Sequence, residues 1–204
     1  MAVSGRLRVF VSAGPHLEAE REVVGETIAS LPVSAGWVIK YTPSRGEPPR
    51  AAFEAVAASH FYVLLMGADI TAPVGSELHV ARKRSKRILA LLKDRPRTPA
   101  ARVFIKDASL EWHHFGHHHQ MRTLLQRHLA QRILDGAPTY GISPVDWEAL
   151  TALLAELKDQ EGVTQEQETV APGRRGAGSD AVIVAPGRDL PPDGVLIEPS
   201  EGRS

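Results

Sequence analysis

The stretch Phe61-Tyr62-Val63-Leu64-Leu65-Met66, closed by Gly67, decides the fold class of this chain. Every side chain of the run before the glycine is apolar or aromatic. A strand that is apolar at every position is buried on both faces, as happens at the centre of a parallel sheet with helices on either side. The stretch therefore predicts the central strand of an α/β domain.

Other apolar runs and amphipathic segments flank this strand. Further strands are expected at residues 7–11, 37–41 and 88–92, with a shorter fifth candidate at 103–105. Helical spacing of apolar residues predicts helices over 16–31, 49–58 and 75–86, and two closing helices over 121–134 and 144–158. Strands alternating with helices indicate a flavodoxin-like, doubly wound parallel sheet of four to five strands in the order 2-1-3-4-5. The 7–11 strand should then pair with the 61–66 strand.

The composition changes near the end of the chain. After Gly162, Gln, Glu, Gly, Pro and Arg dominate and helical periodicity is lost. We therefore expect one α/β domain over residues 1–160 and a flexible, disordered Pro/Gly-rich tail over 161–204. Two small apolar runs, 182–184 and 195–197, leave open a hairpin or a short linear motif that adds to the sheet edge of a protein partner.

The composition of the chain limits which kinds of partner and which cellular compartment are expected. Lys and Arg total 24, as do Asp and Glu, so the net charge of zero disfavours nucleic acid or an anionic membrane as the main partner. The chain has no cysteine, which excludes disulfides and a thiolate nucleophile. The sequence shows neither a signal peptide nor an apolar run long enough to span a membrane. We expect a cytoplasmic protein that needs no cofactor.

Glu77 is the first candidate for chemistry. It lies in Gly75-Ser76-Glu77-Leu78, which we expect to open a helix just after the central strand and its loop. Unpaired N–H groups and the positive end of the helix dipole would keep a carboxylate there ionised. Such a group could orient a ribose hydroxyl, stabilise an oxocarbenium ion or attack an anomeric carbon. The alternative is helix capping, with Ser76 as the cap and Glu77 as a first-turn acid.

A ligand site is expected beyond the carboxyl ends of the first and third strands, where the winding of such a sheet reverses. Small residues in the loop after the first strand would let a phosphate or base approach the backbone, although a simple tight turn explains them equally well. No dinucleotide fingerprint or P-loop is present. The expected ligand-binding residues are Ser12, Ala13, Gly14, Gly67, Asp69 and Ser76.

A run of histidines has two interpretations. The residues concerned are His113, His114, His117, His118 and His119. Histidines four residues apart could chelate a metal if the segment were helical. Gly116 interrupts the run, however, and no regular metalloprotease motif is present. A solvated polar connector without a physiological metal is the expected structure.

Two blocks of the sequence resemble a bacterial TIR-like domain family of unknown function. The first block is Val9-Phe10-Val11-Ser12 followed by Leu17-Glu18-Ala19-Glu20-Arg21. The second is Tyr62-Val63-Leu64-Leu65-Met66-Gly67, then Gly75-Ser76-Glu77-Leu78 and Ala81. The resemblance extends over residues 7–135 and implies the same α/β fold.

That family is similar to TIR domains and to nucleoside 2-deoxyribosyltransferases. Some members of those groups cleave the N-glycosidic bond of nucleosides or of NAD with one glutamate at the mouth of the sheet. The resemblance implies that Glu77 is this glutamate and that Ser12 and Gly14 line the nucleotide pocket. Related transferases carry an aspartate just before the third strand, where this chain has Ser59-His60.

Three functions follow from these observations. The first is an N-glycosidase or transferase in bacterial signalling or defence, acting on NAD or a nucleoside through Glu77. The second is a non-catalytic nucleotide sensor with the same pocket. The third is an adaptor that self-associates as a homo-oligomer and recruits a protein partner through its tail.

Overall fold

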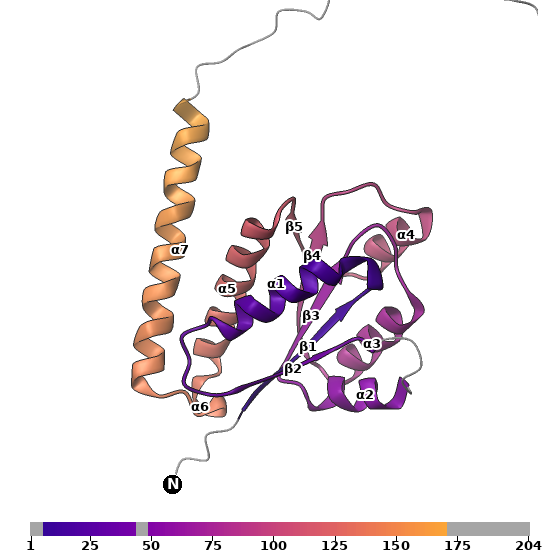
Figure 1. The fold of residues 1–204 in the computed structure, drawn as a ribbon, viewed down its shortest axis with the longest axis horizontal. Coiled ribbons are helices and arrows are strands. Elements are labelled where there is room, and N and C mark those ends of the chain that lie inside the picture. The colour runs from indigo at the N-terminus through magenta and orange to yellow at the C-terminus, as the bar shows by residue number, and fades with distance from the viewer. Residues whose placement is uncertain (1–5, 44–48, 171–204) are drawn as a thin grey trace, which may run out of the picture.

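Five parallel strands form one sheet in the order β2-β1-β3-β4-β5 (Figure 1). The strands are β1 (Leu7–Ala13), β2 (Trp37–Tyr41), β3 (Phe61–Met66), β4 (Arg87–Lys93) and β5 (Trp112–Phe115). β1 pairs with β3 in parallel, with Val9 opposite Phe61, as predicted. The computed structural model describes residues 6–43 and 49–170, and for residues 161–170 it describes the backbone alone. The doubly wound α/β fold is confirmed.

Helices cover both faces of this sheet. One face packs against α1 (Glu18–Ala29) and α5 (His118–Asp135), and α7 (Pro144–Val170) packs on α5 from outside. The other face carries α2 (Pro49–Ala58), α3 (Ala72–Lys83) and α4 (Pro99–Asp107). A short 3-10 helix, η1 (Pro15–Leu17), leads into α1, and α6 (Ala137–Tyr140) follows α5. The central strand β3 is buried at all six positions, as its sequence predicted.

The fifth strand was predicted at the wrong place. Residues 103–105 lie in α4, which Thr98 caps by accepting a hydrogen bond from the Ala101 N–H. Ala101, Phe104 and Ile105 pack on the sheet at helical spacing, whereas Val103 is 59% exposed. The period of the segment is therefore that of a helix. β5 instead runs through the histidine segment, which is not a connector.

Three other boundaries differ from expectation, and the first two of them affect the site. β1 continues to Ala13, so Ser12 and Ala13 belong to the strand and not to the loop after it. α3 begins at Ala72 and not at residue 75, with Thr71 as the extended N-cap residue. α7 continues to Val170, past residue 161 where we expected the tail to begin. Residues 171–204, with the apolar runs 182–184 and 195–197, lie outside the described part of the chain.

Candidate functional site

Glu77 lies inside the molecule, not on its surface. Because α3 begins at Ala72, Glu77 falls in the second turn of the helix, and its side chain is 0% exposed. Thr71 occupies the N-cap position, so Ser76 is no cap and Glu77 is no first-turn acid. The helix-capping explanation is therefore wrong, and a buried carboxylate needs partners that compensate for its lost hydration.

Two hydroxyl groups supply those partners. Ser12 Oγ at the end of β1 donates to Glu77 Oε2 at 2.5 Å, and Thr42 Oγ1 just after β2 donates to the same oxygen at 2.8 Å. Thr42 Oγ1 in turn accepts the Ala13 N–H at 3.1 Å, which fixes its orientation. The other carboxylate oxygen, Oε1, is buried and has no hydrogen-bond partner among the described residues. One oxygen is therefore anchored, and the other keeps its lone pairs free.

The environment acts on the pKa of Glu77 in two directions. Burial raises the pKa above its usual value, while the hydrogen bonds from Ser12 and Thr42 and the charge of Arg21 lower it. Burial has the larger effect. We expected the helix start to favour the ionised form, but Glu77 sits one turn too far along α3 for the helix end to dominate.

A cleft of about 970 Å³ opens beside Glu77. Its walls come from the end of β1, the segment after β2, and the beginnings of α2 and α3. Its lining residues are Ala13, Pro15, Arg21, Thr42, Pro43, Pro49, Ala52, Phe53, Thr71, Ala72, Pro73, Ser76 and Glu77. The cleft lies next to the point where β1 and β3 diverge in the winding of the sheet, as expected for this class of fold.

Among the described residues that line the cleft, Arg21 is the one that carries a positive charge. Its guanidinium lies 5.0 Å from the centre of the Tyr41 ring and donates to the Thr42 carbonyl oxygen at 3.4 Å. These two contacts hold the positive charge near the mouth of the cleft. A guanidinium in that place suits an anionic group such as a phosphate.

The structure separates the expected ligand-binding residues into two groups. Ala13 and Ser76 line the cleft, and Ser12 holds Glu77. The other three do not line it: they are Gly14, Gly67 and Asp69.

Those three residues have other contacts. A Cβ on Gly14 or Gly67 would lie within 3 Å of the His16 ring, so both glycines make room for that imidazole. The Asp69 carboxylate accepts hydrogen bonds from Thr98 Oγ1 and from the Ile70 N–H. Asp69 therefore ties the loop before α3 to the start of α4.

Thr42 and Arg21 are the site residues that the sequence analysis missed. Thr42 is the first residue after β2, and β2 pairs directly with β1. A hydroxyl residue at the carboxyl end of a strand beside the switch point is a signal that could have found it. Arg21 belongs to the first block of the family resemblance. Its position in the sequence did not indicate that its side chain lines the cleft.

The histidine run divides between β5 and the beginning of α5. His113 on β5 contacts His128 on α5, with ring centres 4.1 Å apart, and His114 lies 2.8 Å from Asp94. Within residues 6–43 and 49–160, no three His, Cys, Asp or Glu side chains lie close enough together to hold a metal ion.

Comparisons with known proteins give likenesses to solved structures, and none to a family profile or a curated sequence. A solved structure of the CMP N-glycosidase BcmB from Clostridium botulinum is similar at 17% identity and a TM-score of 0.41, covering 58% of this chain and 97% of that one. The resemblance to the TIR-like family therefore stays a prediction. No helix in the described residues is long and apolar enough to cross a membrane.

Proposed function

We propose that this protein cleaves the N-glycosidic bond of a nucleotide and that Glu77 is its nucleophile. The observation that carries the proposal is the buried Glu77 carboxylate, which has one oxygen anchored by Ser12 and Thr42 and the other unpartnered. The motif resemblance, which implies the same role for Glu77, agrees with this geometry. That resemblance alone suggests bacterial signalling or defence as the setting.

The anchored oxygen explains how the free oxygen would act. Two donors on Oε2 fix the plane of the carboxylate, so the direction of Oε1 is set before a ligand binds. Because Oε1 is itself buried, a substrate must displace side chains of the cleft wall to reach it. Burial removes the water that would otherwise screen its charge, and electrostatic stabilisation of a cationic sugar is stronger at low dielectric. Both effects favour attack on an anomeric carbon or stabilisation of an oxocarbenium ion.

The reaction proceeds in two displacements. Glu77 Oε1 forms a bond to C1′ of the ribose as the C1′–N bond breaks, and the electron pair of that bond goes to the departing nitrogen. Water then attacks C1′, the ester bond to Glu77 breaks, and the proton of the water passes to solvent. The carboxylate is regenerated, and the products are the free base and the ribosyl compound.

The lining of the cleft favours one class of leaving group. Among its described residues Glu77 is the single acid, and no histidine lines it. A neutral nucleoside base needs a proton as it leaves, whereas a pyridinium base leaves as a neutral molecule without one. Arg21 would bind a phosphate of the same substrate. NAD therefore fits the cleft better than an unphosphorylated nucleoside does.

A second candidate function rests on a different observation. Val145 and Trp147, at the beginning of α7, are 74% and 46% exposed. Tryptophan is among the residues enriched in protein–protein interfaces. The two exposed side chains favour an adaptor that self-associates or binds a protein partner, with the tail as an additional contact.

The deciding experiment compares the wild type with Glu77→Gln. Each protein is incubated with NAD and a panel of nucleotides and nucleosides, and released base is measured by chromatography. We expect the wild type to release nicotinamide and Glu77→Gln to be slower by orders of magnitude, because an amide neither attacks C1′ nor carries the needed charge. Glu54→Gln, which alters an exposed acid on α2, should act like the wild type.

Other outcomes separate the remaining functions. Ligand binding without base release in either protein would establish a nucleotide sensor. Neither binding nor release across the panel would favour the adaptor. Equal release by the wild type and Glu77→Gln would refute the proposed role of Glu77.

A further inference from the structure

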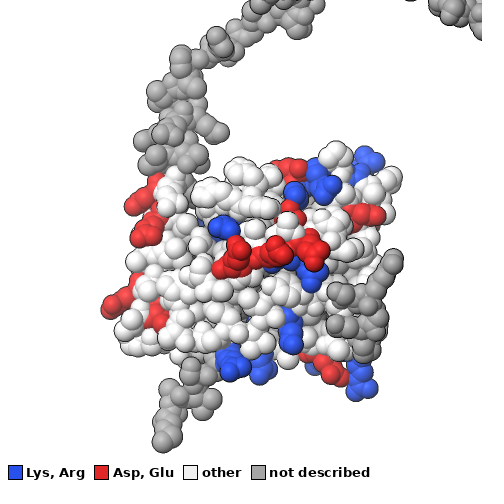
Figure 2. Space-filling model, in the orientation of Figure 1, with Lys and Arg blue, Asp and Glu red and all other residues white. Residues whose placement is uncertain are grey.

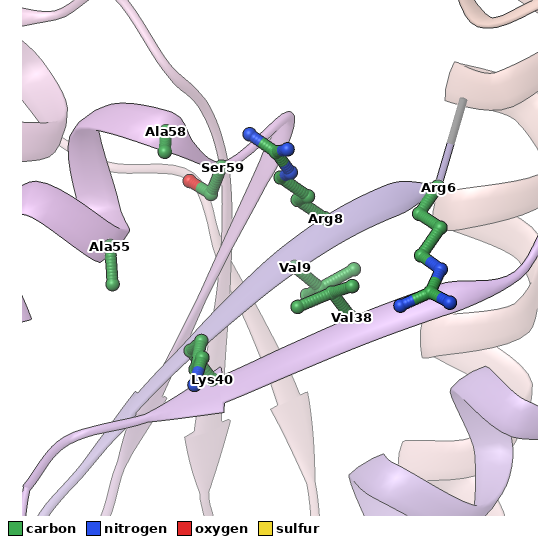
Figure 3. Close-up of a pocket in the computed structure, with 8 residues that line it drawn as sticks. All are labelled: Arg6, Arg8, Val9, Val38, Lys40, Ala55, Ala58 and Ser59. Carbon is green, nitrogen blue, oxygen red and sulfur yellow. The ribbon is translucent and has the colours of Figure 1, made fainter. Parts of the chain in front are cut away.

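A second cavity, of about 400 Å³, lies between β1, β2 and α2 (Figure 3). We call it the basic groove. It is lined by Arg6, Arg8, Val9, Val38, Lys40, Ala55, Ala58 and Ser59. None of these residues lines the Glu77 cleft, so the two cavities are separate.

The register of the sheet brings the cations of the groove together. Arg6 and Arg8 are two residues apart, and β1 pairs with β2 so that Arg8 stands opposite Val38 and Phe10 opposite Lys40. Because side chains alternate along a strand, Arg8 and Lys40 project from the same face of the sheet. Figure 3 shows Arg6 and Lys40 on opposite sides of Val38, and Arg8 extending from β1 toward Ser59 at the end of α2.

These charges have no counter-ions in the described structure. The lining contains no Asp or Glu, and the side chains of Arg6, Arg8 and Lys40 are exposed and form no ion pair among the described residues. Basic residues elsewhere, such as Lys93 and Arg122, do have acidic partners. Figure 2 shows the contrast: acidic side chains form a row over α1, and basic ones lie along the lower edge of the molecule near the start of β1.

The surroundings add further positive charge. Lys86 Nζ donates to the Ser59 carbonyl oxygen at 2.6 Å, at the border of the groove. His60 follows Ser59, and its pKa is lowered first by burial and then by the charges of Arg8 and Lys86. An anion in the groove would relieve this repulsion.

We propose that the basic groove is a second ligand site, which binds a small phosphate-bearing molecule with an apolar part. The phosphate pairs with Arg8 and Lys40, since a guanidinium and an ammonium are the side chains that bind phosphate best. The apolar part lies on Val38, Ala55 and Ala58. The volume falls within the range of small-molecule sites. This site is independent of the reaction proposed for Glu77.

The test is calorimetric titration of the full chain with 1-naphthyl phosphate, inorganic phosphate and 1-naphthol. We expect 1-naphthyl phosphate to bind most tightly, because it alone offers both the charge and the apolar ring. Arg8→Gln and Lys40→Gln should each weaken its binding about tenfold, the loss expected for one charged hydrogen bond. Arg102→Gln removes an exposed arginine of α4 that does not line the groove, and it should bind as the wild type does.

Two results with the variants would overturn the proposal. One is equal affinity of the wild type, Arg8→Gln and Lys40→Gln for 1-naphthyl phosphate. The other is loss of binding in Arg21→Gln alone, which would place the anion in the Glu77 cleft. As a readout that needs no variant, NMR titration of His60 should show its pKa rising when 1-naphthyl phosphate is added, and an unchanged pKa would count against the groove.

Discussion

At Glu77, burial and hydrogen bonding oppose one another. Burial disfavours the charged carboxylate, and the two hydroxyl donors on Oε2 favour it. The nucleophile proposed here must be ionised to attack. Ser12 and Thr42 therefore have a chemical consequence beyond orientation: they lower the pH above which Glu77 is a carboxylate, against the larger effect of burial.

Replacing Ser12 by Ala tests this balance. Loss of the donor should raise the pKa of Glu77 further above its usual value, because one of the contacts that stabilise the anion is gone. Base release should then decline at a higher pH as the solution is acidified. The pKa can be read from ¹³C NMR of the Glu77 carboxyl, with Glu77→Gln for assignment. Ser59→Ala, also a buried serine but bonded to the Val56 carbonyl, serves as control. An unchanged Glu77 pKa in Ser12→Ala would disprove the effect.

Glu77 and Ser12 were candidates from the sequence, whereas the contacts that surround them could not be predicted from it. Their contact joins residues 65 positions apart, and the Thr42 contact joins residues 35 apart, so both depend on the pairing of β1 with its neighbours. Burial of Glu77 also depends on where α3 begins. A shift of the helix start moved the residue from an exposed first turn to a buried second turn, and boundaries are what a local pattern specifies least.

Among the elements, the pair β5 and α5 combines apolar packing with a contact between two histidines. His113 and His128 are partly buried with their rings 4.1 Å apart. Burial, His113 and the cations Arg127 and Arg132 lower the pKa of His128 to about 4. Burial also lowers the pKa of His113. Both rings are therefore neutral in the folded protein at neutral pH.

The lowered pKa of His128 predicts that the folded protein loses stability in mild acid. Between pH 6.5 and about 4, His128 takes up a proton in the unfolded chain but not in the folded one, so lowering the pH favours unfolding. His128 alone should contribute a loss of about 1–2 kcal/mol between pH 7 and 5. Urea unfolding at several pH values measures it. His128→Gln should reduce the pH dependence, and His119→Gln, an exposed histidine of α5, should not. If the free energy of unfolding depends on pH equally in His128→Gln and in the wild type, His128 is not the source of the acid sensitivity.

The same elements show which secondary structure can be predicted from local sequence. β3, β2 and α2 match their expected residues. Glycine or proline marks an end of each segment: Gly67 follows β3, Gly36 precedes β2, and α2 begins at Pro49. The run 103–105 was taken for a strand because it is apolar, although its neighbour Ala101 gives it helical spacing. β5 is short and contains His113 and His114, so only its pairing with β4 makes it a strand.

For the whole molecule, the α7 helix determines where the stable domain ends. Asp146 at its start accepts hydrogen bonds from the N–H and the hydroxyl of Ser34, which follows α1. Leu150 is 0% and Leu157 5% exposed, and α7 packs on α5. These contacts make the first part of α7 an integral part of the core, although the segment lies far from the sheet in sequence.

Two truncations follow from this arrangement. Removal of residues 163–204 should leave the melting temperature within a few degrees of the full chain, because Leu157 is the last buried side chain on the part of α7 whose side chains are described. Ending the chain after Ser143 should lower it by at least about 10 °C, since two buried leucines are lost and Ser34 loses its carboxylate partner. Calorimetry of the three proteins measures both effects. A large drop on removing 163–204 would mean that the end of the chain packs on the domain, and the core would then include residues that we assign to the tail.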